Sequence, residues 1–510
     1  MISKTGCLVD TNPNFINPLV YEVLGVSTNV RITNLTMDTQ YYVKGFIEED
    51  GVRKYSSNTK NFRTLAADVD YLTFVNEFAG QNTIRLIKYG SPATVTLEYT
   101  KDSGTTWTTW TSTSGTLSIT LEEGESVWFR GNNSTFSNDT SNFFSFDATQ
   151  PFSAYGSPIT LLSKTHATND APPMAFYKLF YLCNNLKRHP DLEINQTLRS
   201  TSNIYSGSVY REAFRGCTGL TYIDLHWLDV ISGHTCTFAY AFYGCSNVES
   251  IDFGNFKGFD RSSGWSGYHT FEYAFADCTK IKEINLQYYE SGSFDGTSSA
   301  AAFNRGFYAC SNIEKVDLSS CDGKVLADFQ YGFQNCTSLN TIITGANLTT
   351  IYDLYHIYNQ FDYCSAITKL DFSTIKDINS TFRPANNCSA LKKIDLSGLE
   401  AVGYSGHIGP FERCTSLEVV DMRKLTAWDS DRSTSIMNRA FPDCSAITDI
   451  YIGATTWDAD LAFKDWLKDT GATGTLHISQ QLNIGSLPGE IPLQSDSGIP
   501  SGWTYVQDLP

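Results

Sequence analysis

The sequence predicts a mainly β protein in which N-terminal β-sandwich modules are followed by a long solenoid of stacked repeats. A pattern of phenylalanine, cysteine, aliphatic and acidic residues returns at short intervals between residues 176 and 452. Ahead of it, residues 1–150 contain short runs rich in β-branched and aromatic residues, separated by Gly, Ser, Asn and Asp. Aromatic residues make up 14% and apolar residues 41% of the 510 residues, which indicates packed structure throughout.

The repeat unit is clearest in AFRGCTGLTYIDL, residues 213–225, which reads F-x-x-C-[T/S/N]-x-[L/I/V]-x-x-[I/L/V]-[D/N]-[L/F]. The opening copy at Phe180 loses register at His189 and Pro190, and a later copy has Ala385 where Phe is expected. Successive cysteines lie 24 to 34 residues apart, within or just above the period of leucine-rich repeats. One unit cannot bury its apolar face alone, so neighbouring units must stack and share a core. The remaining copies have their phenylalanine at Phe214, Phe242, Phe275, Phe307, Phe333, Phe361, Phe411 and Phe441.

Each L-x-x-I-D-L run alternates inward apolar and outward polar residues, as a short strand does. The Phe and Cys three residues apart belong to the turn before that strand, where cysteine is expected to act as a small buried hydrophobe. The segments AFRGCTGLTYIDL, AFYGCSNVESIDF and GFYACSNIEKVDL resemble BspA-like leucine-rich repeats over somewhat more than half the chain. That family is found in bacterial surface adhesins and in fibre or appendage proteins of phages of gut bacteria. The resemblance therefore implies recognition or scaffolding, not an enzyme.

Residues 1–66 are predicted to form the first of the N-terminal β-sandwich modules. Leu35, Thr39 and Tyr41 match the tyrosine-corner positions, and Phe62 to Leu65 the last strand, of a fibronectin type III or immunoglobulin-like domain, so the segment resembles a partial module of that kind. The segment KTGCLVDTNPNF resembles a middle strand, so the first two strands are not accounted for. A sandwich without them has an open edge. Either the domain is a reduced variant, or another chain supplies the missing strands.

Residues 67–150 are predicted to form a second β-sandwich module. Its strand-like runs are YLTFVNEF, NTIRLIKYG, ATVTLEYT, TWTTWT, TLSITL and ESVWFRG. Within it, TKDSGTTW resembles the Asp-box of sialidase propellers, with Asp102, Gly104 and Trp107 matching. One copy does not make a propeller, so we expect a hairpin turn in which the aspartate accepts hydrogen bonds from backbone amides.

Residues 151–452 are assigned to the leucine-rich repeat solenoid with its N-terminal cap, and residues 453–510 to a C-terminal cap. In the C-terminal cap, TWDADLAFKDWLKDTG has apolar residues at helical spacing and a glycine at its end, which predicts a helix. The segments TLHI and GWTYV are predicted to be closing strands.

Charge and cysteine usage exclude several classes of function. The net charge of -17, from 37 basic and 54 acidic residues, opposes binding to nucleic acid. Ten of the 13 cysteines occupy the repeat position and no C-x-x-C pair occurs, so mostly free, buried thiols are expected. We predict no catalytic residue, cofactor or metal site, because neither a G-x-S-x-G elbow nor a P-loop occurs and the histidines lack metal-ligand spacing. The eight histidines, among them His189 and His226, are interpreted as scattered surface or loop residues.

The first candidate ligand surface is a column of acidic and amide residues at one outward strand position. Stacked strands would place these side chains about 4.8 Å apart, and such close carboxylates should raise one another's pKa unless hydrogen bonds or cations compensate. One interpretation is a cation-assisted or glycan-binding strip, and the other is a solvated ladder satisfied by neighbouring Ser, Thr and Lys side chains. The column consists of Asp224, Asp252, Asn285, Asp317, Asp371, Asp395 and Asp421.

The second candidate surface consists of two long segments rich in aromatic residues, residues 254–273 and 287–303. Exposed aromatic side chains bind sugars or protein partners, but these rings could also cover the far side of the core. The candidate contact residues are Trp265, Tyr268, Tyr288 and Tyr289.

The resemblance to BspA-like repeats, taken with these features, implies a phage virion structural protein, a head or tail fibre or appendage at the particle surface. Residues 1–66 are expected to contact other virion proteins, and the solenoid to bind a host-surface or mucus glycan or protein. The N-terminal residues have no apolar signal segment and no run of 18 apolar residues occurs, so neither export nor membrane insertion is expected. The alternative is a BspA-like adhesin on the bacterial cell surface, and a third interpretation is a carbohydrate-active enzyme. We expect a homo-oligomer, and a trimer is one option although no coiled-coil heptads occur.

Overall fold

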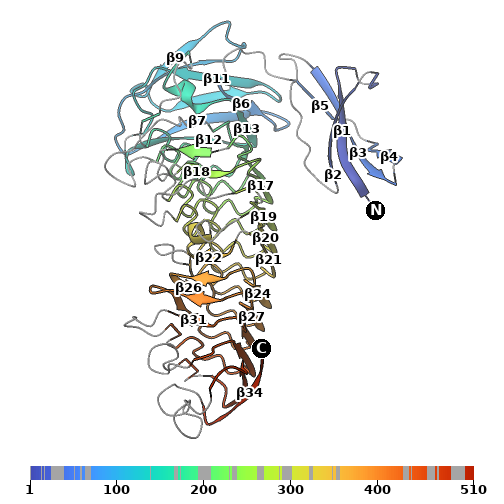
Figure 1. Ribbon diagram of the computed structural model, residues 1–510. Helices are drawn as coiled ribbons and strands as arrows, with labels where there is room; N and C mark the ends of the chain where they lie inside the picture. Colours follow the sequence, from blue (N-terminus) through green and yellow to red (C-terminus); the bar gives the residue numbers. More distant parts are fainter. Residues whose placement is uncertain are drawn as a thin grey trace.

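The computed structural model is an elongated β structure in which a broad β body at one end continues into a stack of repeats (Figure 1). This architecture confirms the predicted fold class. Helical turns among the described residues comprise two 3-10 segments, η1 (Pro158–Leu161) and η2 (Ala327–Phe329), and no described helix is long and apolar enough to cross a membrane. The structure describes residues 2–12, 14–16, 18–24, 40–50, 52–57, 60–63, 71–137, 139–165, 171–172, 174–192, 208–228, 230–232, 238–260, 269–286, 288–289, 301–320, 326–346, 348–351, 357–428, 436–437, 439–456, 466–467, 470–483 and 500–510.

The N-terminal strands form a single antiparallel sheet of order β2-β1-β3-β4, in which β5 pairs with the other half of β3. The predicted middle strand is β1, and it is paired on both sides. A second layer, as in the predicted sandwich, is not found among the described residues. Leu35 and Thr39 lie outside those residues, whereas Tyr41 in β3 is opposite Phe62 in β5. The strands are β1 (Ile2–Asp10), β2 (Leu19–Leu24), β3 (Gln40–Glu49), β4 (Val52–Tyr55) and β5 (Lys60–Arg63).

The second module consists of two facing antiparallel sheets, and all six predicted strands are present. One sheet has the order β13-β6-β11-β8-β9 and the other β10-β7-β12. Alternation of buried and exposed residues in β10 and β7 places aliphatic side chains between the sheets. The strands are β6 (Leu72–Asn76), β7 (Asn82–Tyr89), β8 (Thr96–Thr100), β9 (Thr108–Thr111), β10 (Leu117–Leu121), β11 (Ser126–Gly131), β12 (Phe143–Ala148) and β13 (Phe152–Tyr155).

The sandwich and the solenoid share one hydrophobic core. Strand β13 belongs to the sandwich and also pairs in parallel with β14 (Leu186–Arg188), the strand of the opening repeat. Phe180 of that repeat contacts Phe74 and Phe146 of the sandwich, with ring centroids 5.6 and 5.9 Å apart. The change from sandwich to solenoid therefore lies between β13 and β14, later than the predicted boundary after residue 150. The sandwich itself covers the first end of the solenoid core.

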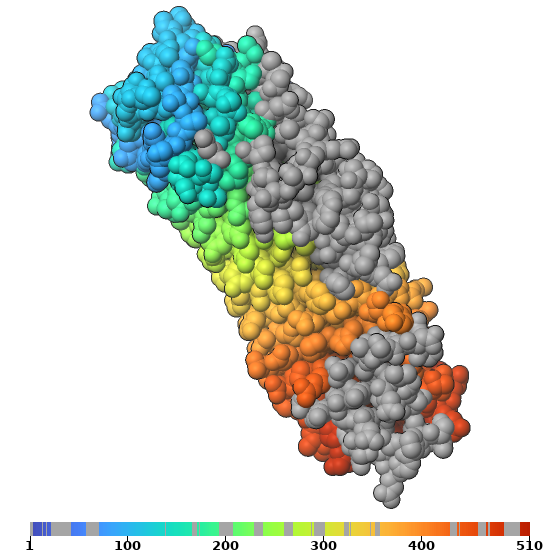
Figure 2. Space-filling view, turned by 90° about the vertical axis from the view of Figure 1, so that its left-hand side faces the viewer, coloured from blue at the N-terminus to red at the C-terminus, as the bar shows by residue number. Residues whose placement is uncertain are grey.

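Each repeat of the solenoid contributes up to three very short strands, which stack in parallel on the next repeat. Figure 2 shows the result, a rod along which the colours follow the sequence. The main column contains the predicted L-x-x-I-D-L strands: β15 (Tyr222–Asp224), β17 (Ser250–Asp252), β19 (Glu283–Asn285), β20 (Lys315–Leu318), β21 (Thr341–Thr344), β24 (Lys369–Asp371), β27 (Lys393–Asp395), β30 (Val419–Met422) and β32 (Asp449–Ile452). The second column contains β16 (Val230–Ser232), β18 (Gly258–Asp260), β22 (Thr350–Ile351), β25 (Asp377–Ile378), β28 (Ala401–Val402) and β31 (Ala427–Trp428). The third contains β23 (Ile357–Tyr358), β26 (Thr381–Arg383) and β29 (His407–Ile408).

The phenylalanines of the repeat form a ladder along the core. Consecutive rings from Phe180 to Phe361 are stacked nearly parallel, with centroids 5.0 to 5.9 Å apart. At the missing step, Ala385 is also fully buried. The ladder explains why the sequence repeats this residue, since each ring is covered by its neighbours on both sides.

The repeated cysteines are free and buried wherever the structure describes them, as predicted. Most of their thiols donate to the carbonyl oxygen of the phenylalanine one repeat earlier, as Cys217 does to Phe180 at 2.8 Å and Cys336 to Phe307 at 3.3 Å. Burial raises the pKa of Cys217 and Cys336 well above the usual value, which keeps both thiols protonated and unreactive.

The turn before each main strand has a fixed backbone conformation. The residue two positions after the repeated phenylalanine, or after Ala385, has a positive φ in every copy from Phe180 to Phe441. Two copies have glycine there, Gly216 and Gly244, both with φ 73°. The other copies place an ordinary side chain in this left-handed conformation, which is strained for residues that have a Cβ.

Replacing Ala309 by glycine is therefore expected to stabilise the protein. Ala309 has φ 58°, so glycine relieves the left-handed strain, and the net gain in the free energy of unfolding is about 1 kcal/mol. Urea denaturation measures it. Ala302→Gly is the matched control, because Ala302 is fully buried and is not among the residues with positive φ. A loss of stability in both variants would contradict this interpretation of the turn.

His189 closes the irregular opening repeat. Its side chain is only 3% exposed and its ring lies near Phe214 and Phe242. Nδ1 lies 2.8 Å from the carbonyl oxygen of Pro190, and Nε2 lies 2.9 Å from the amide nitrogen of Asp224. These contacts fit the neutral tautomer that donates from Nδ1 and accepts at Nε2. His189 was predicted to be a scattered surface or loop residue, and burial shows that this prediction was wrong.

The C-terminal end is closed by two parallel strands, β33 (Thr473–Ser479) and β34 (Gly502–Leu509), which confirms the two predicted closing strands. The indole nitrogen of Trp503 donates to the carbonyl oxygen of Gly471 at 2.9 Å and fixes the end of the core. Most of the predicted helix lies outside the described residues. Trp466 and Leu467, which belong to it, are fully buried and lie in a turn.

Candidate ligand surface on the solenoid

The predicted acidic column exists, in three groups along the main strand column. Asp224 is opposite Asp252, Asn285 is opposite Asp317, and a further group consists of Asp371, Asp395 and Asp421 in consecutive strands. Ile343 occupies the position after Asp317 and interrupts the column. The sequence prediction is therefore correct in position, although the carboxylates do not form one unbroken row.

Each aspartate of the column is the last or the second-last residue of its strand and accepts a hydrogen bond in an Asx-type turn. One carboxylate oxygen accepts a hydrogen bond from the backbone N–H two residues later, at 2.8 to 3.4 Å, in all six aspartates. Such a bond turns the chain away from the strand. The structure thus gives a local backbone reason for the repeated acidic residue.

Lysine and arginine side chains neutralise the last group of the column. Lys369 pairs with Asp371 and Asp395 at 2.7 and 3.3 Å, and Lys393 pairs with Asp395 and Asp421 at 3.0 and 3.5 Å. Arg423 makes two hydrogen bonds to Asp421, at 2.8 and 2.6 Å, and Asp421 is only 2% exposed. Repulsion between these carboxylates is therefore offset by lysine and arginine side chains of the chain itself.

The pKa values follow from these contacts. Burial raises the pKa of Asp395, but hydrogen bonds from Ser397 and Lys393 outweigh burial and bring the pKa down to about 2. Asp371 has a pKa below its usual value because hydrogen bonds from Lys369 and Ser373 outweigh the effect of burial. Mutual repulsion does not dominate at either site. Among the described residues, no group of three or more His, Cys, Asp or Glu side chains could hold a metal ion.

Substitutions at Asp395 separate its role as a hydrogen-bond acceptor in the turn from its role in ion pairs with Lys369 and Lys393. Asp395→Ala removes the turn acceptor and both ion pairs, and we expect a loss of about 2 kcal/mol in the free energy of unfolding. Asp395→Asn keeps an acceptor for Ser397 and should lose about half as much. Urea denaturation of both variants measures the difference. Calcium and EDTA should leave the Tm of the wild-type protein unchanged, and a Tm that rises with calcium would contradict the structural role.

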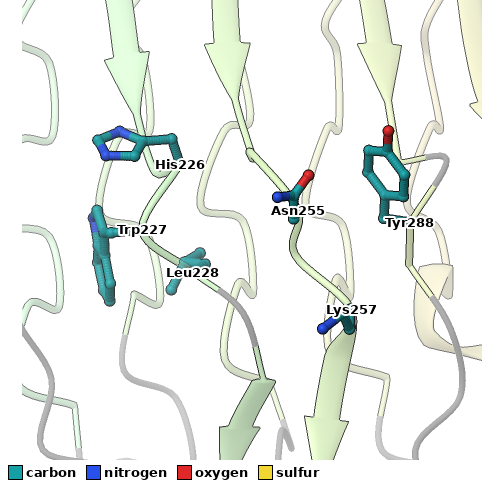
Figure 3. Close-up of a pocket in the computed structure, with 6 residues that line it drawn as sticks. All are labelled: His226, Trp227, Leu228, Asn255, Lys257 and Tyr288. Atoms are coloured by element: carbon teal, nitrogen blue, oxygen red, sulfur yellow. The ribbon is translucent and has the colours of Figure 1, made fainter. Parts of the chain in front are cut away.

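A pocket lies beside the first group of the column, where the chain leaves β15, β17 and β19 (Figure 3). Its volume is about 410 Å³. The imidazole of His226 is hydrogen-bonded to Asp224, which links the pocket to the column. The lining residues are His226, Trp227, Leu228, Asn255, Lys257 and Tyr288.

The four predicted aromatic contact residues have different positions. Tyr288 is 48% exposed and lines the pocket. Tyr289 is 1% exposed, packs on Phe256 and Phe303, and donates its hydroxyl to Asp328 at 2.8 Å, so it is a core residue and its prediction as a surface residue was wrong. Trp265 and Tyr268 lie outside the described residues.

Sequence reasoning missed His226, Trp227, Asn255 and Lys257. Asn255 and Lys257 are within the predicted aromatic-rich segment, but neither carries a motif, and His226 was interpreted as a scattered histidine. A signal does exist, because Trp227 and Asn255 stand three residues after Asp224 and Asp252. Their equal offset from the aspartates of the column shows that Trp227 and Asn255 occupy equivalent positions in successive repeats.

The Asp-box-like segment is a hairpin turn, as predicted. Asp102 accepts from the amide of Thr106 at 2.9 Å, and the indole nitrogen of Trp107 donates to the carbonyl oxygen of Gly104 at 3.1 Å. Hydrogen bonds from Thr100 and Thr106 lower the pKa of Asp102 to about 2. These contacts account for the three matching residues without a ligand.

Comparison with known families supports the repeat assignment. The profile of the BspA type leucine-rich repeat region, which contains six copies, matches residues 177–304, 271–382, 302–426 and 358–464. The overlapping matches span residues 177–464, more than half of the chain, and include the stacked strands from β14 to β32. No curated protein matches the chain.

Proposed function

The chain belongs to the BspA-type leucine-rich repeat family, and from this premise we propose that it is a non-catalytic recognition protein of a phage particle. In this proposal it is a head or tail fibre or appendage. The solenoid binds a host-surface or mucus ligand, and residues 1–66 contact other virion proteins. Repeats of this type serve in many proteins as surface or adhesion modules, which supports the recognition role.

The single observation that carries the recognition role is the pocket of His226, Trp227, Asn255, Lys257 and Tyr288. It combines partly exposed aromatic rings with amide and ammonium groups, the combination that orients small polar ligands without reacting with them. Asp224, at the end of the strand that leads to His226, accepts a hydrogen bond from the backbone amide of His226 and is hydrogen-bonded to its ring. The proposal therefore assigns this site to binding and not to turnover.

The attachment role is supported by the N-terminal sheet. In β2, Leu19 and Val20 are 48% and 47% exposed, and the nearby Ile16 is 66% exposed. Apolar side chains on a strand at the end of a sheet favour pairing or packing with another chain. We propose that this strand contacts a virion protein or a second copy of the chain within a homo-oligomer.

Three experiments test the proposal. Antibodies against the full chain should label purified phage particles, and the purified full chain should compete with those particles for host cells. Labelling of the bacterial envelope instead would contradict the virion assignment and favour the adhesin. Release of sugars from host glycans by the purified chain would contradict the non-catalytic role.

A further inference from the structure

Wherever the structure describes it, the turn after a strand that carries a residue of the acidic column alternates in a regular way. The residue four positions after the column residue points into the core and is at most 2% exposed, while the residue before it lies at the surface. The inward residues are Leu228, Phe256, Tyr289, Ile375, Leu399 and Leu425. The residues before them form an outward row that runs alongside the acidic column.

The outward row has large ring side chains only where the pocket lies. Its first three members are Trp227, Asn255 and Tyr288, which stand side by side in this order in Figure 3. Three residues after the later aspartates of the column, the same position holds Ser320, Thr374, Gly398 and Lys424. The pocket therefore combines two rings with a smaller amide side chain between them, an arrangement that the repeat pattern does not require.

The spacing of the row sets the size of the site. Trp227 and Tyr288 are carried by strands two steps apart, so their backbones stand roughly 10 Å apart, twice the spacing of about 4.8 Å between neighbouring strands. Asn255 lies between them, and Leu228 forms an apolar wall that is 2% exposed. This width fits a small ring that enters from solvent between the two aromatic side chains.

We propose that this pocket binds a neutral pyranose at the end of a host glycan, held between Trp227 and Tyr288. The inference rests on the proposed recognition function and names its ligand class. A pyranose has C–H faces that pack on aromatic rings, and hydroxyl groups at its edge that both donate and accept hydrogen bonds. Asn255 offers a donor and an acceptor for those hydroxyls, and Lys257 offers donors.

The charges around the pocket favour a neutral sugar over an acidic one. Asp224 and Asp252 lie at the ends of the strands that lead into it, and the whole chain has a net charge of -17. Among the described residues, Lys257 is the only lysine or arginine that lines the pocket, and His226 is hydrogen-bonded to Asp224. A carboxylate-bearing sugar would therefore meet more negative than positive charge.

The test is binding of the full chain to a panel of neutral pyranosides and of uronic and sialic acids, by saturation-transfer NMR and calorimetry. Tyr288→Ala and Asn255→Ala change exposed side chains and should keep the fold. Each is expected to weaken binding of a neutral pyranoside about tenfold, which corresponds to the loss of one aromatic or hydrogen-bonding contact. Tyr288→Phe should retain most of the affinity. Thr374→Ala, at the same row position outside the pocket, is the matched control and should bind like the wild type.

The outcomes test the ligand class and the proposed recognition function separately. Unchanged affinity in both Tyr288→Ala and Asn255→Ala would overturn the inference, as would preferential binding of acidic sugars. If no sugar binds at millimolar concentration while the full chain still competes with particles for host cells, the pyranose site is wrong and recognition stands. Loss of both activities would reject the recognition role as well.

Discussion

Replacing Phe307 by alanine is expected to lower the free energy of unfolding by about 3 to 5 kcal/mol. Phe307 is fully buried and stacks on Phe275 and Phe333, with ring centroids 5.3 and 5.2 Å apart. Alanine leaves a cavity that neither neighbouring repeat can fill without breaking the stack. Because stability in a solenoid is a sum of interfaces between neighbours, the interfaces on both sides weaken together.

Urea denaturation followed by circular dichroism measures this loss. The control is Tyr363→Ala, which removes a ring that is 45% exposed and should change the free energy of unfolding by no more than about 0.5 kcal/mol. Equal effects of the two substitutions would contradict the phenylalanine ladder as the main packing element.

The second large effect is a pH dependence that arises from His189. Burial lowers its pKa to about 4, although the hydrogen bond to Pro190 opposes this change. Between pH 4 and about 6.5, the ordinary value, the unfolded chain binds the proton and the folded chain does not. Stability from this residue is therefore complete above pH 6.5 and is lost as the pH falls, by about 3 kcal/mol in total.

The measurement must compare the wild type with His189→Gln, because another group acts in the opposite sense. Burial raises the pKa of Asp362 to about 7, so its contribution to stability falls as the pH rises from about 4 to 7. Because Asp362 is present in both proteins, its contribution cancels in the difference between their free energies of unfolding. That difference should shift in favour of the wild type by about 3 kcal/mol from pH 4 to pH 7, and a difference that is constant with pH would contradict a buried neutral His189.

The sequence was sufficient to predict the solenoid because its constraints are local and repeated. Each repeat has a phenylalanine and a cysteine three residues apart, as in Phe307 and Cys310. The pattern within a single copy is enough to place both in the turn before a strand. The left-handed residue at Ala309 has a weaker signal, glycine in only Gly216 and Gly244, and was not predicted. The fusion of sandwich and solenoid through β13 depends on pairing between distant segments, which no local pattern reveals.

The candidate site could be predicted only in part. Tyr288 and Tyr289 are adjacent and chemically alike, yet one is in solvent and the other in the core, and the offset from Asn285 decides which. The aspartates were correctly aligned, but their hydrogen bonds to the backbone two residues later and their pairing with Lys369 and Lys393 depend on turn geometry. Trp227 and Asn255 belong to successive repeats, and they become neighbours only because the repeats stack in register.

Recognition is proposed to take place at the pocket on the first repeats of the solenoid. Hydrogen exchange of the full chain, with and without purified host-surface glycan, tests this claim most directly. We expect slower exchange on binding in residues 226–228, 255–257 and 288–289, with no change in the turns around Thr374 and Lys424. Protection confined to residues 2–63, or spread evenly along the solenoid, would contradict it.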